Sequence, residues 1–223
     1  MRTPWLLPLL LWAVVSCTPP LLAPPELTPA DDSKAGCEAV FPKGKWQFVH
    51  SIEFTLADGQ RGNALGVSVI DGPIIDCVIM TLEGFVLFEA RLDGDLAVKK
   101  AVPPFTGEAF ARGLLADIQL IFTPPPHHET QHGLLGNGEV VCRYQGARGE
   151  LTDVILHDQG WEIDRYTADR KRTRTVQGRL LRPPESNDPW QTPSVLELTS
   201  HEPEGYHLRM NLVSATRDTS PDI

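Results

Sequence analysis

The sequence lacks the features of a membrane-spanning or nucleic-acid-binding protein. After the first residues, no stretch is long and apolar enough to form the helix of about 20 residues that crosses a bilayer. Basic residues are also few, with 20 Lys and Arg against 29 Asp and Glu, and the formal net charge is −9. Since the phosphates of nucleic acids repel a chain of this charge, we expect no nucleic-acid partner.

Signatures of common catalytic sites are also missing. The chain has no Gly-x-Ser-x-Gly nucleophile motif, no glycine-rich phosphate loop and no Cys-x-x-Cys. Its acidic residues are scattered among turns. Asp117, within a predicted helix, is expected to face solvent or to cap the helix, and the basic run 169–174 to form a solvated hairpin tip. We therefore expect a binding protein without a cofactor rather than an enzyme.

Histidines form one cluster that allows a different hypothesis. His127, His128 and His132 lie in the segment HHETQH, and imidazole is a common ligand of zinc and nickel. A metal-dependent enzyme using this loop is a less favoured alternative, because the order is His-His-Glu and three prolines precede it. We interpret 124–138 as a solvated loop with no metal site. His50, on an apolar strand face, is interpreted as a hydrogen-bonded core histidine.

The amino terminus has the pattern of a targeting segment. Arg2 precedes an apolar run from Trp5 to Val15, which is the length of a signal-peptide core. The following residues, Val-Val-Ser-Cys ending at Cys17, resemble the bacterial lipobox. The resemblance implies cleavage before Cys17 and acylation of this residue, and two or three acyl chains anchor a protein stably. Thr18 favours the outer membrane, so we expect a lipid-anchored protein of the bacterial envelope that faces the periplasm.

The chain divides into three predicted parts. Residues 1–16 form the signal peptide, 17–36 the acylated cysteine with a Pro-rich tether, and 37–223 a single domain. Cys37, Cys77 and Cys142 remain in the domain. An exported compartment permits one disulfide and one free thiol, and the sequence leaves the pairing open.

Strand and helix periods predict a mainly β domain. The segment 45–56 alternates apolar and polar residues, and further strands are predicted at 64–70, 74–82, 85–92, 96–102, 139–144, 151–157, 161–166, 172–180, 194–199 and 206–213. Between the two sets, 106–122 has helical spacing, with Thr106 as the expected N-cap. About eleven antiparallel strands with one helix on one side make an α+β fold.

The order of short motifs resembles a family. GFVLFEARLDG, LLADIQLIF and EGYHLRMNL follow one another, with Asp-Gly at 93–94, Asp-x-Gln-Leu at 117–120 and Gly-Tyr-x-Leu at 205–208. The pattern, over about 46–213, is similar to that of bacterial lipoproteins distantly related to LolB. The resemblance implies the LolA/LolB fold, a strongly curved, incompletely closed antiparallel β-barrel with a helix on its concave side. In these relatives the concave face holds acyl chains. A protruding hydrophobic loop is not identified, because PPFTGEAF reads better as the start of the helix.

A curved sheet presents an apolar face wider than one helix can fill. We therefore expect an apolar ligand pocket for a lipid or acylated molecule, with ordinary core packing as the alternative for each residue. The alternative function is a structural or accessory envelope lipoprotein that binds a protein partner. The expected pocket residues come from three strands and the helix: Trp46, Phe48, Ile52, Phe54, Phe88, Phe110, Leu114, Ile118, Tyr206, Leu208 and Met210.

Overall fold

The computed structural model describes residues 23–30, 36–180 and 192–218. The signal peptide and Cys17 lie outside these residues, as does part of the predicted tether. Among the described residues, no helix has the length and apolar character needed to cross a bilayer.

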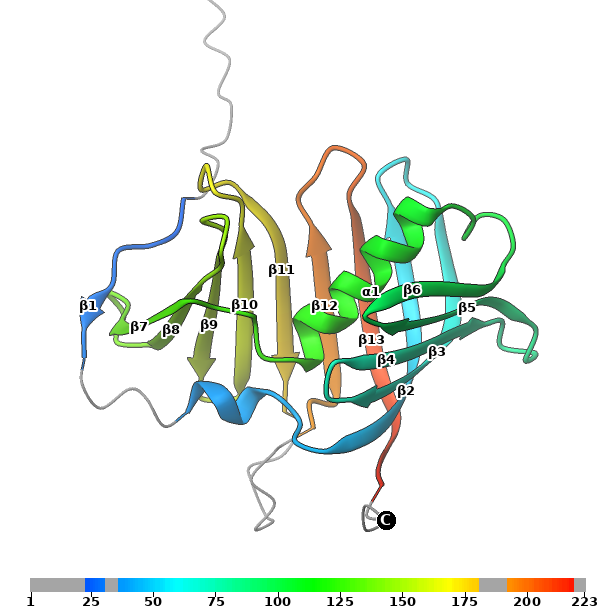
Figure 1. Cartoon of the computed structure of the whole chain (residues 1–223), viewed down its shortest axis with the longest axis horizontal. Coiled ribbons are helices and arrows are strands. Elements are labelled where there is room, and N and C mark those ends of the chain that lie inside the picture. Colours follow the sequence, from blue (N-terminus) through cyan, green and yellow to red (C-terminus); the bar gives the residue numbers. More distant parts are fainter. Residues whose placement is uncertain (1–22, 31–35, 181–191, 219–223) are drawn as a thin grey trace, which may run out of the picture.

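Thirteen antiparallel strands of the described residues form a single sheet (Figure 1). The strands run in the order β1-β7-β8-β9-β10-β11-β12-β13-β2-β3-β4-β5-β6, so the edges are β1 and β6 and the sheet does not close. Their bounds are β1 Thr28–Pro29, β2 Lys45–Leu56, β3 Arg61–Asp71, β4 Ile74–Met80, β5 Val86–Asp93, β6 Asp95–Ala101, β7 Glu129–Leu134, β8 Val140–Gln145, β9 Leu151–His157, β10 Gly160–Tyr166, β11 Arg172–Arg179, β12 Val195–Ser200 and β13 Tyr206–Arg217. The predicted open, curved sheet is confirmed.

Two meanders make up this sheet. Strands β2 to β6 follow one another as hairpins, and β7 to β13 do the same. The long strands β13 and β2 join the two halves through an antiparallel register from Tyr206↔Leu56 to Arg217↔Trp46. β2 and β13 are therefore far apart in the sequence but adjacent in the sheet, so β13 side chains lie beside those of β2.

One helix, α1 (Glu108–Phe122), crosses the concave side of the sheet between the halves (Figure 1). The predicted N-cap at Thr106 is wrong. Gly107 takes this position with φ of 108°, a conformation that favours glycine, and no side chain caps the helix. The buried face of α1 includes Leu115, Ile118 and Phe122, whose ring stacks on Phe48 with the centroids 4.6 Å apart. This packing fixes the carboxyl end of α1 against the core.

Two strands were missed by the sequence prediction, and both lie at one edge of the sheet. β7 falls in the predicted loop 124–138 because ETQHGL has no clear alternation of apolar and polar residues. β1 falls in the predicted tether, and pairs with β7 as Thr28↔Leu134 and Pro29↔Gly133. Gly133 has no side chain, and a Cβ there would stand 2.8 Å from the Thr28 carbonyl oxygen. Part of the tether region therefore lies along the domain.

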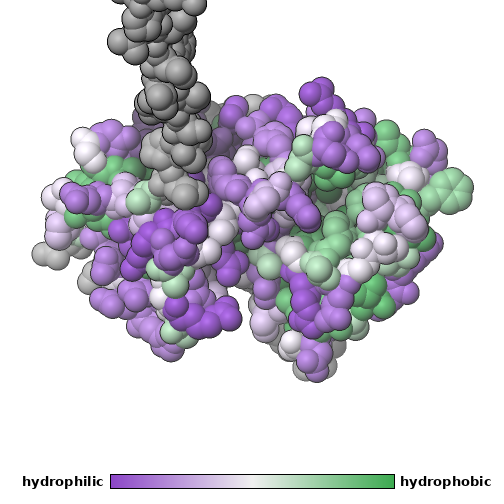
Figure 2. Space-filling view, turned by 90° about the horizontal axis from the view of Figure 1, so that it is seen from above, coloured by the Kyte–Doolittle hydropathy of each residue, from purple (hydrophilic) through white to green (hydrophobic). Residues whose placement is uncertain are grey.

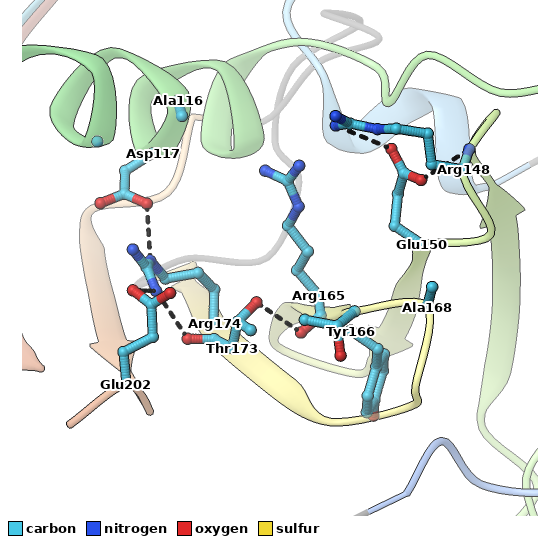
Figure 3. Close-up of a pocket in the computed structure, with 12 residues that line it drawn as sticks. Ala116, Asp117, Arg148, Glu150, Arg165, Tyr166, Ala168, Thr173, Arg174 and Glu202 are labelled. Carbon is cyan, nitrogen blue, oxygen red and sulfur yellow. Dashed lines mark hydrogen bonds and ion pairs between the residues drawn. The ribbon is translucent and has the colours of Figure 1, made fainter. Parts of the chain in front are cut away.

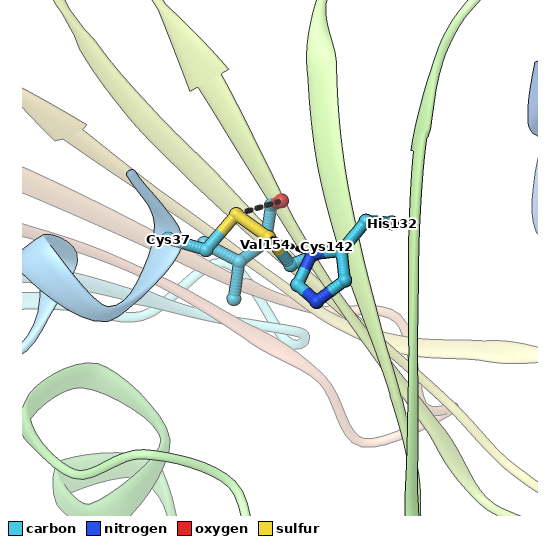
Figure 4. The surroundings of a disulfide bond; sticks show 4 residues. All are labelled: Cys37, His132, Cys142 and Val154. Atoms are coloured by element: carbon cyan, nitrogen blue, oxygen red, sulfur yellow. Dashed lines mark hydrogen bonds between the residues drawn. A yellow bond between two sulfur atoms is a disulfide. The ribbon is translucent and has the colours of Figure 1, made fainter. Parts of the chain in front are cut away.

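A disulfide ties the start of the domain to this half of the sheet (Figure 4). Cys37, in the short 3-10 helix η2 (Cys37–Val40), is bonded to Cys142 on β8 across 105 positions of sequence. Cys77 is free and buried. His132 on β7 places its Nδ1 atom 3.2 Å from the Cys142 sulfur. The structure thereby selects one of the pairings that the sequence left open.

Candidate functional site

The predicted pocket residues lie on the concave side, around α1. Nearly all belong to, or pack against, one hydrophobic cluster that the sheet and α1 share. Five are buried, and the others are partly exposed. The buried ones are Trp46, Phe48, Phe88, Ile118 and Met210, and the partly exposed ones are Ile52, Phe54, Phe110, Leu114, Tyr206 and Leu208.

Burial changes along α1. At its carboxyl end, Phe122, Phe48 and Trp46 form a stack of buried rings, with neighbouring centroids 4.6 and 5.8 Å apart. At its amino end, the rings of Phe105 and Phe110 are only partly buried and lie 5.5 Å apart. One end of the concavity is therefore filled by buried rings, whereas the aromatic side chains at the other end are partly exposed.

Partly exposed apolar side chains surround this open end. Phe110 meets Phe88 edge to face at 5.4 Å, and Phe105 meets Phe54 in the same way at 6.4 Å. Leu208 is paired with Phe54 across β13 and β2, and Leu114 lies one helical turn after Phe110; both pack against the core. We call this set, Phe54, Phe105, Phe110, Leu114 and Leu208, the apolar mouth. In Figure 2, hydrophobic residues gather over the half of the molecule that holds β2–β6, and hydrophilic ones dominate the other half.

A second exposed apolar feature lies at the hairpin between β4 and β5. Leu82 and Phe85 are 60% and 72% exposed, although both are large and apolar. Both lie at the ends of predicted strands, 74–82 and 85–92, where the sequence gives no sign of their exposure. Phe105, in the segment that the sequence analysis assigned to the start of the helix, packs against the core instead of protruding.

Asp117 lies in the middle of α1 and is buried, so the prediction that it faces solvent is wrong. Arg174 on β11 donates a hydrogen bond from Nε to its carboxylate at 3.0 Å, and the Tyr206 hydroxyl donates to its other oxygen. Arg174 also pairs with Glu202 at 2.8 Å. Burial raises the pKa of Asp117, and the charge of Arg174 and the hydrogen bond from Tyr206 oppose this rise.

These partners could not be recognised from the sequence. Arg174 stands 57 positions from Asp117, and Tyr206 stands 89 positions away. Arg172 and Arg174 begin β11, in agreement with the strand predicted at 172–180, but they form ion pairs with Asp164 and Asp117 instead of a solvated hairpin tip. Of the run 169–174, only 169–171 lie in the turn, which begins at Thr167.

A cleft of about 350 Å³ opens beside this ion pair, between α1 and the half-sheet of β9 to β11 (Figure 3). Gly113 and Ala116 form its helix wall. The opposite wall is polar and charged, from Arg148, Glu150, Arg165, Tyr166, Thr167, Ala168, Thr173, Arg174 and Glu202. A smaller cleft of about 160 Å³ adjoins it and shares Ala116, Glu150 and Arg165. The structure thus adds a polar site that sequence reasoning did not predict.

The histidine cluster is dispersed by the fold. His132 lies within β7, while the His127 ring packs edge to face on Tyr144 at 5.1 Å. The backbone of His128 donates to the Gln145 carbonyl at 3.0 Å. In the described part of the chain, no group of three or more His, Cys, Asp or Glu residues is arranged to hold a metal ion. The predicted solvated loop is wrong for 129–134.

His50 is buried on β2 beside the stacked rings of Phe48 and Phe122, at centroid distances of 6.3 and 6.2 Å. Burial lowers its pKa to about 4. Its core position is confirmed, but no hydrogen bond of its ring is found among residues 23–30, 36–180 and 192–218. At neutral pH this imidazole is therefore an uncharged part of the core.

Two solved structures are similar to this chain at low sequence identity. A LolA superfamily protein from Nitrosomonas europaea has a TM-score of 0.49 and 11% identity, over 83% of this chain and 93% of that one. A domain from Vibrio parahaemolyticus, named for outer membrane lipoprotein sorting, has a TM-score of 0.44 and 9% identity, over 83% of this chain and 90% of that one. A scan against protein-family models and a search of curated proteins find no match.

Proposed function

We propose that this protein binds or transfers a lipid-like or acylated molecule, held in the apolar mouth between the amino end of α1 and the curved sheet. The observation that carries the proposal is the change in burial along α1. Large contiguous apolar patches on the surface of a monomeric protein commonly mark a binding site. Here these side chains converge from the helix, the preceding loop and two strands.

The position of α1 suits a lid over the ligand. The stack of Phe122 on Phe48 holds its carboxyl end, whereas Gly107 begins it with no side-chain cap. Local opening is easiest where a segment has few buried contacts. We expect the amino end of α1 to move aside for an acyl chain while the carboxyl end stays in place.

The hairpin tip with Leu82 and Phe85 gives the protein a second apolar contact, outside the mouth. Transferring such side chains from water to an apolar environment is favourable by about 1.5 to 3 kcal/mol each. We propose that this tip inserts into the periplasmic leaflet of the bilayer that supplies or receives the ligand. Acylated Cys17 would keep the domain beside that bilayer, at the periplasmic face of the outer membrane, with 17–36 as its tether.

The test uses an acyl-chain probe. A dansyl-labelled fatty acid should bind the purified protein with increased fluorescence, and unlabelled phospholipid should displace it. Leu114→Glu, which puts a charge in the mouth, and Leu114→Trp, which fills it, should each weaken probe binding at least about tenfold.

Val213→Glu is the matched control, because Val213 is 61% exposed and lies outside the mouth. Equal probe affinity in all variants, or no probe binding by the unaltered protein, would refute the proposal. Co-purification of a protein partner without lipid would favour the accessory role instead.

A further inference from the structure

Arg165 occupies a central place in the 350 Å³ cleft. It lies on β10, where its Cα partners are Thr152 on β9 and Arg174 on β11. Its side chain is partly buried and, in Figure 3, extends toward α1 near Ala116, between the Asp117 and Glu150 sides of the cleft. Both clefts of this face include it in their walls.

The other charged side chains of this cleft form ion pairs, whereas Arg165 acts on Asp117 and Glu150 only through its longer-range charge. Arg174 forms ion pairs with both Asp117 and Glu202. The Nη2 atom of Arg148 lies 3.7 Å from the Oε1 atom of Glu150. Among the described residues, no ion pair or hydrogen bond engages the guanidinium of Arg165. A guanidinium carries five N–H donors in a planar fork, and leaving it unpaired in a partly buried site costs free energy. An anionic ligand would supply the hydrogen-bond acceptors that this guanidinium lacks.

The cleft also indicates the kind of anion. Arg148 is 87% exposed and its ion pair is long, so it is free to turn toward a ligand on Arg165. Two guanidinium groups match the double negative charge of a phosphate monoester, and their forks suit its oxygens. Beyond Arg165, the smaller cleft offers the apolar surfaces of Leu120, Pro125 and Tyr144.

We propose that Arg165, with Arg148, binds the phosphate group of an amphiphilic ligand in this cleft. The inference rests on the proposed function for the ligand's apolar part and adds the chemistry of its head group. Gly113 and Ala116 leave the space on the helix side that the head group needs. Because Arg165 sits beneath α1, phosphate binding there would also hold the helix in place over the ligand.

The experiment measures the affinities of three probes for the purified full chain by calorimetry. Dihexanoylphosphatidate has the phosphate and the acyl chains, dihexanoylglycerol lacks the phosphate, and inorganic phosphate lacks the chains. We expect phosphatidate to bind most tightly, and Arg165→Gln to weaken it about 10- to 100-fold. Arg112→Gln, on the exposed outer side of α1 beside Glu108, should leave the affinity unchanged.

Each outcome bears on the proposal separately from the lipid-binding role. Equal affinity of Arg165→Gln and the unaltered chain for phosphatidate would overturn the phosphate site. If the unaltered chain also bound dihexanoylglycerol as tightly as phosphatidate, the lipid-carrier role would stand without a phosphate site. Binding of inorganic phosphate that depends on Arg165, with no lipid binding, would support the site and refute the carrier role. No binding of any probe would overturn both.

A second measurement keeps the proposal testable should Arg165→Gln not fold. The ¹⁵N-labelled guanidine Nε–H resonance of Arg165 in the unaltered chain should shift on addition of phosphatidate and not of dihexanoylglycerol. An unchanged resonance at saturation would overturn the proposal.

Discussion

Removing the buried cation Arg174 should destabilise the fold strongly. The side chains of Arg174 and Asp117 are only 13% and 7% exposed, so Arg174→Met leaves a buried carboxylate without its counter-ion. Breaking such a pair costs about 3 to 5 kcal/mol. Glu202, the other partner of Arg174, is 55% exposed and can be hydrated, so the cost falls on Asp117.

The size of the effect on melting temperature follows from the length of the chain. For a protein of 223 residues, a loss of 1 kcal/mol lowers Tm by about 2 to 4 °C, so Arg174→Met should lower Tm by about 6 to 20 °C at pH 7. The double variant Arg174→Met/Asp117→Asn lacks the unpaired buried carboxylate and should recover a large part of the lost Tm.

The pH dependence has a definite sign. Burial raises the pKa of Asp117 in the folded protein above its ordinary value of 3.8, so its contribution to stability is fully present below that value and is lost as pH rises through the folded pKa. Loss of Arg174 raises this pKa further, so the penalty of Arg174→Met should be largest at pH 7 and shrink toward pH 4. Thermal unfolding, monitored by circular dichroism at pH 7 and at pH 4, measures the Tm of the unaltered protein and of Arg174→Met. A Tm within about 2 °C of the unaltered protein, or an equal penalty at both pH values, would refute the reasoning.

Three further predictions test other parts of the structure. Burial lowers the pKa of His50 from 6.5 to about 4, so the stability that the neutral imidazole contributes should be lost as pH falls from about 6.5 toward 4. An NMR resonance of the His50 ring that titrates near pH 6.5 would contradict this burial. Replacing Cys37 and Cys142 by Ser should lower the free energy of unfolding in urea by about 2 to 5 kcal/mol, since the bond closes a loop of 105 residues, and an unchanged value would contradict the disulfide. Replacing Leu82 and Phe85 by Ser should reduce sedimentation of the unacylated protein with vesicles at least about tenfold without lowering Tm, and unchanged sedimentation would remove the tip from the account.

Much of the fold could be predicted because period-2 patterns and glycine turns are local signals. The alternation in 45–56 predicted β2, and the apolar spacing from Phe110 to Ile118 predicted α1. β7 escaped because its stability comes from its neighbours, β1 and β8, rather than from its own apolar residues. A strand that depends on its neighbours in this way has no pattern that a single sequence displays.

The polar cleft could not be predicted, for a related reason. Asp117, Arg165 and Arg174 come from a helix and two strands, and only the sheet register brings them together. A charged residue in an amphipathic helix ordinarily faces solvent, so Asp117 offered no sign of burial. The position of apolar residues such as Leu114 on the inner face of α1 could be predicted, because the spacing of apolar residues is visible in the sequence. The degree of burial of each residue could not be predicted, because it depends on tertiary contacts such as the stack of Phe122 on Phe48.

The central claim is that the apolar mouth holds an acylated molecule, and its most direct test is the content of the purified protein. The chain would be purified from its native membrane, extracted with organic solvent, and the extract analysed by mass spectrometry; covalently attached acyl chains stay with the protein. The account predicts a bound lipid at a near-stoichiometric level in the unaltered chain and in Val213→Glu, and a loss of that lipid in Leu114→Glu. A lipid content that is no higher than in a detergent control, or is equal in all three proteins, would contradict it.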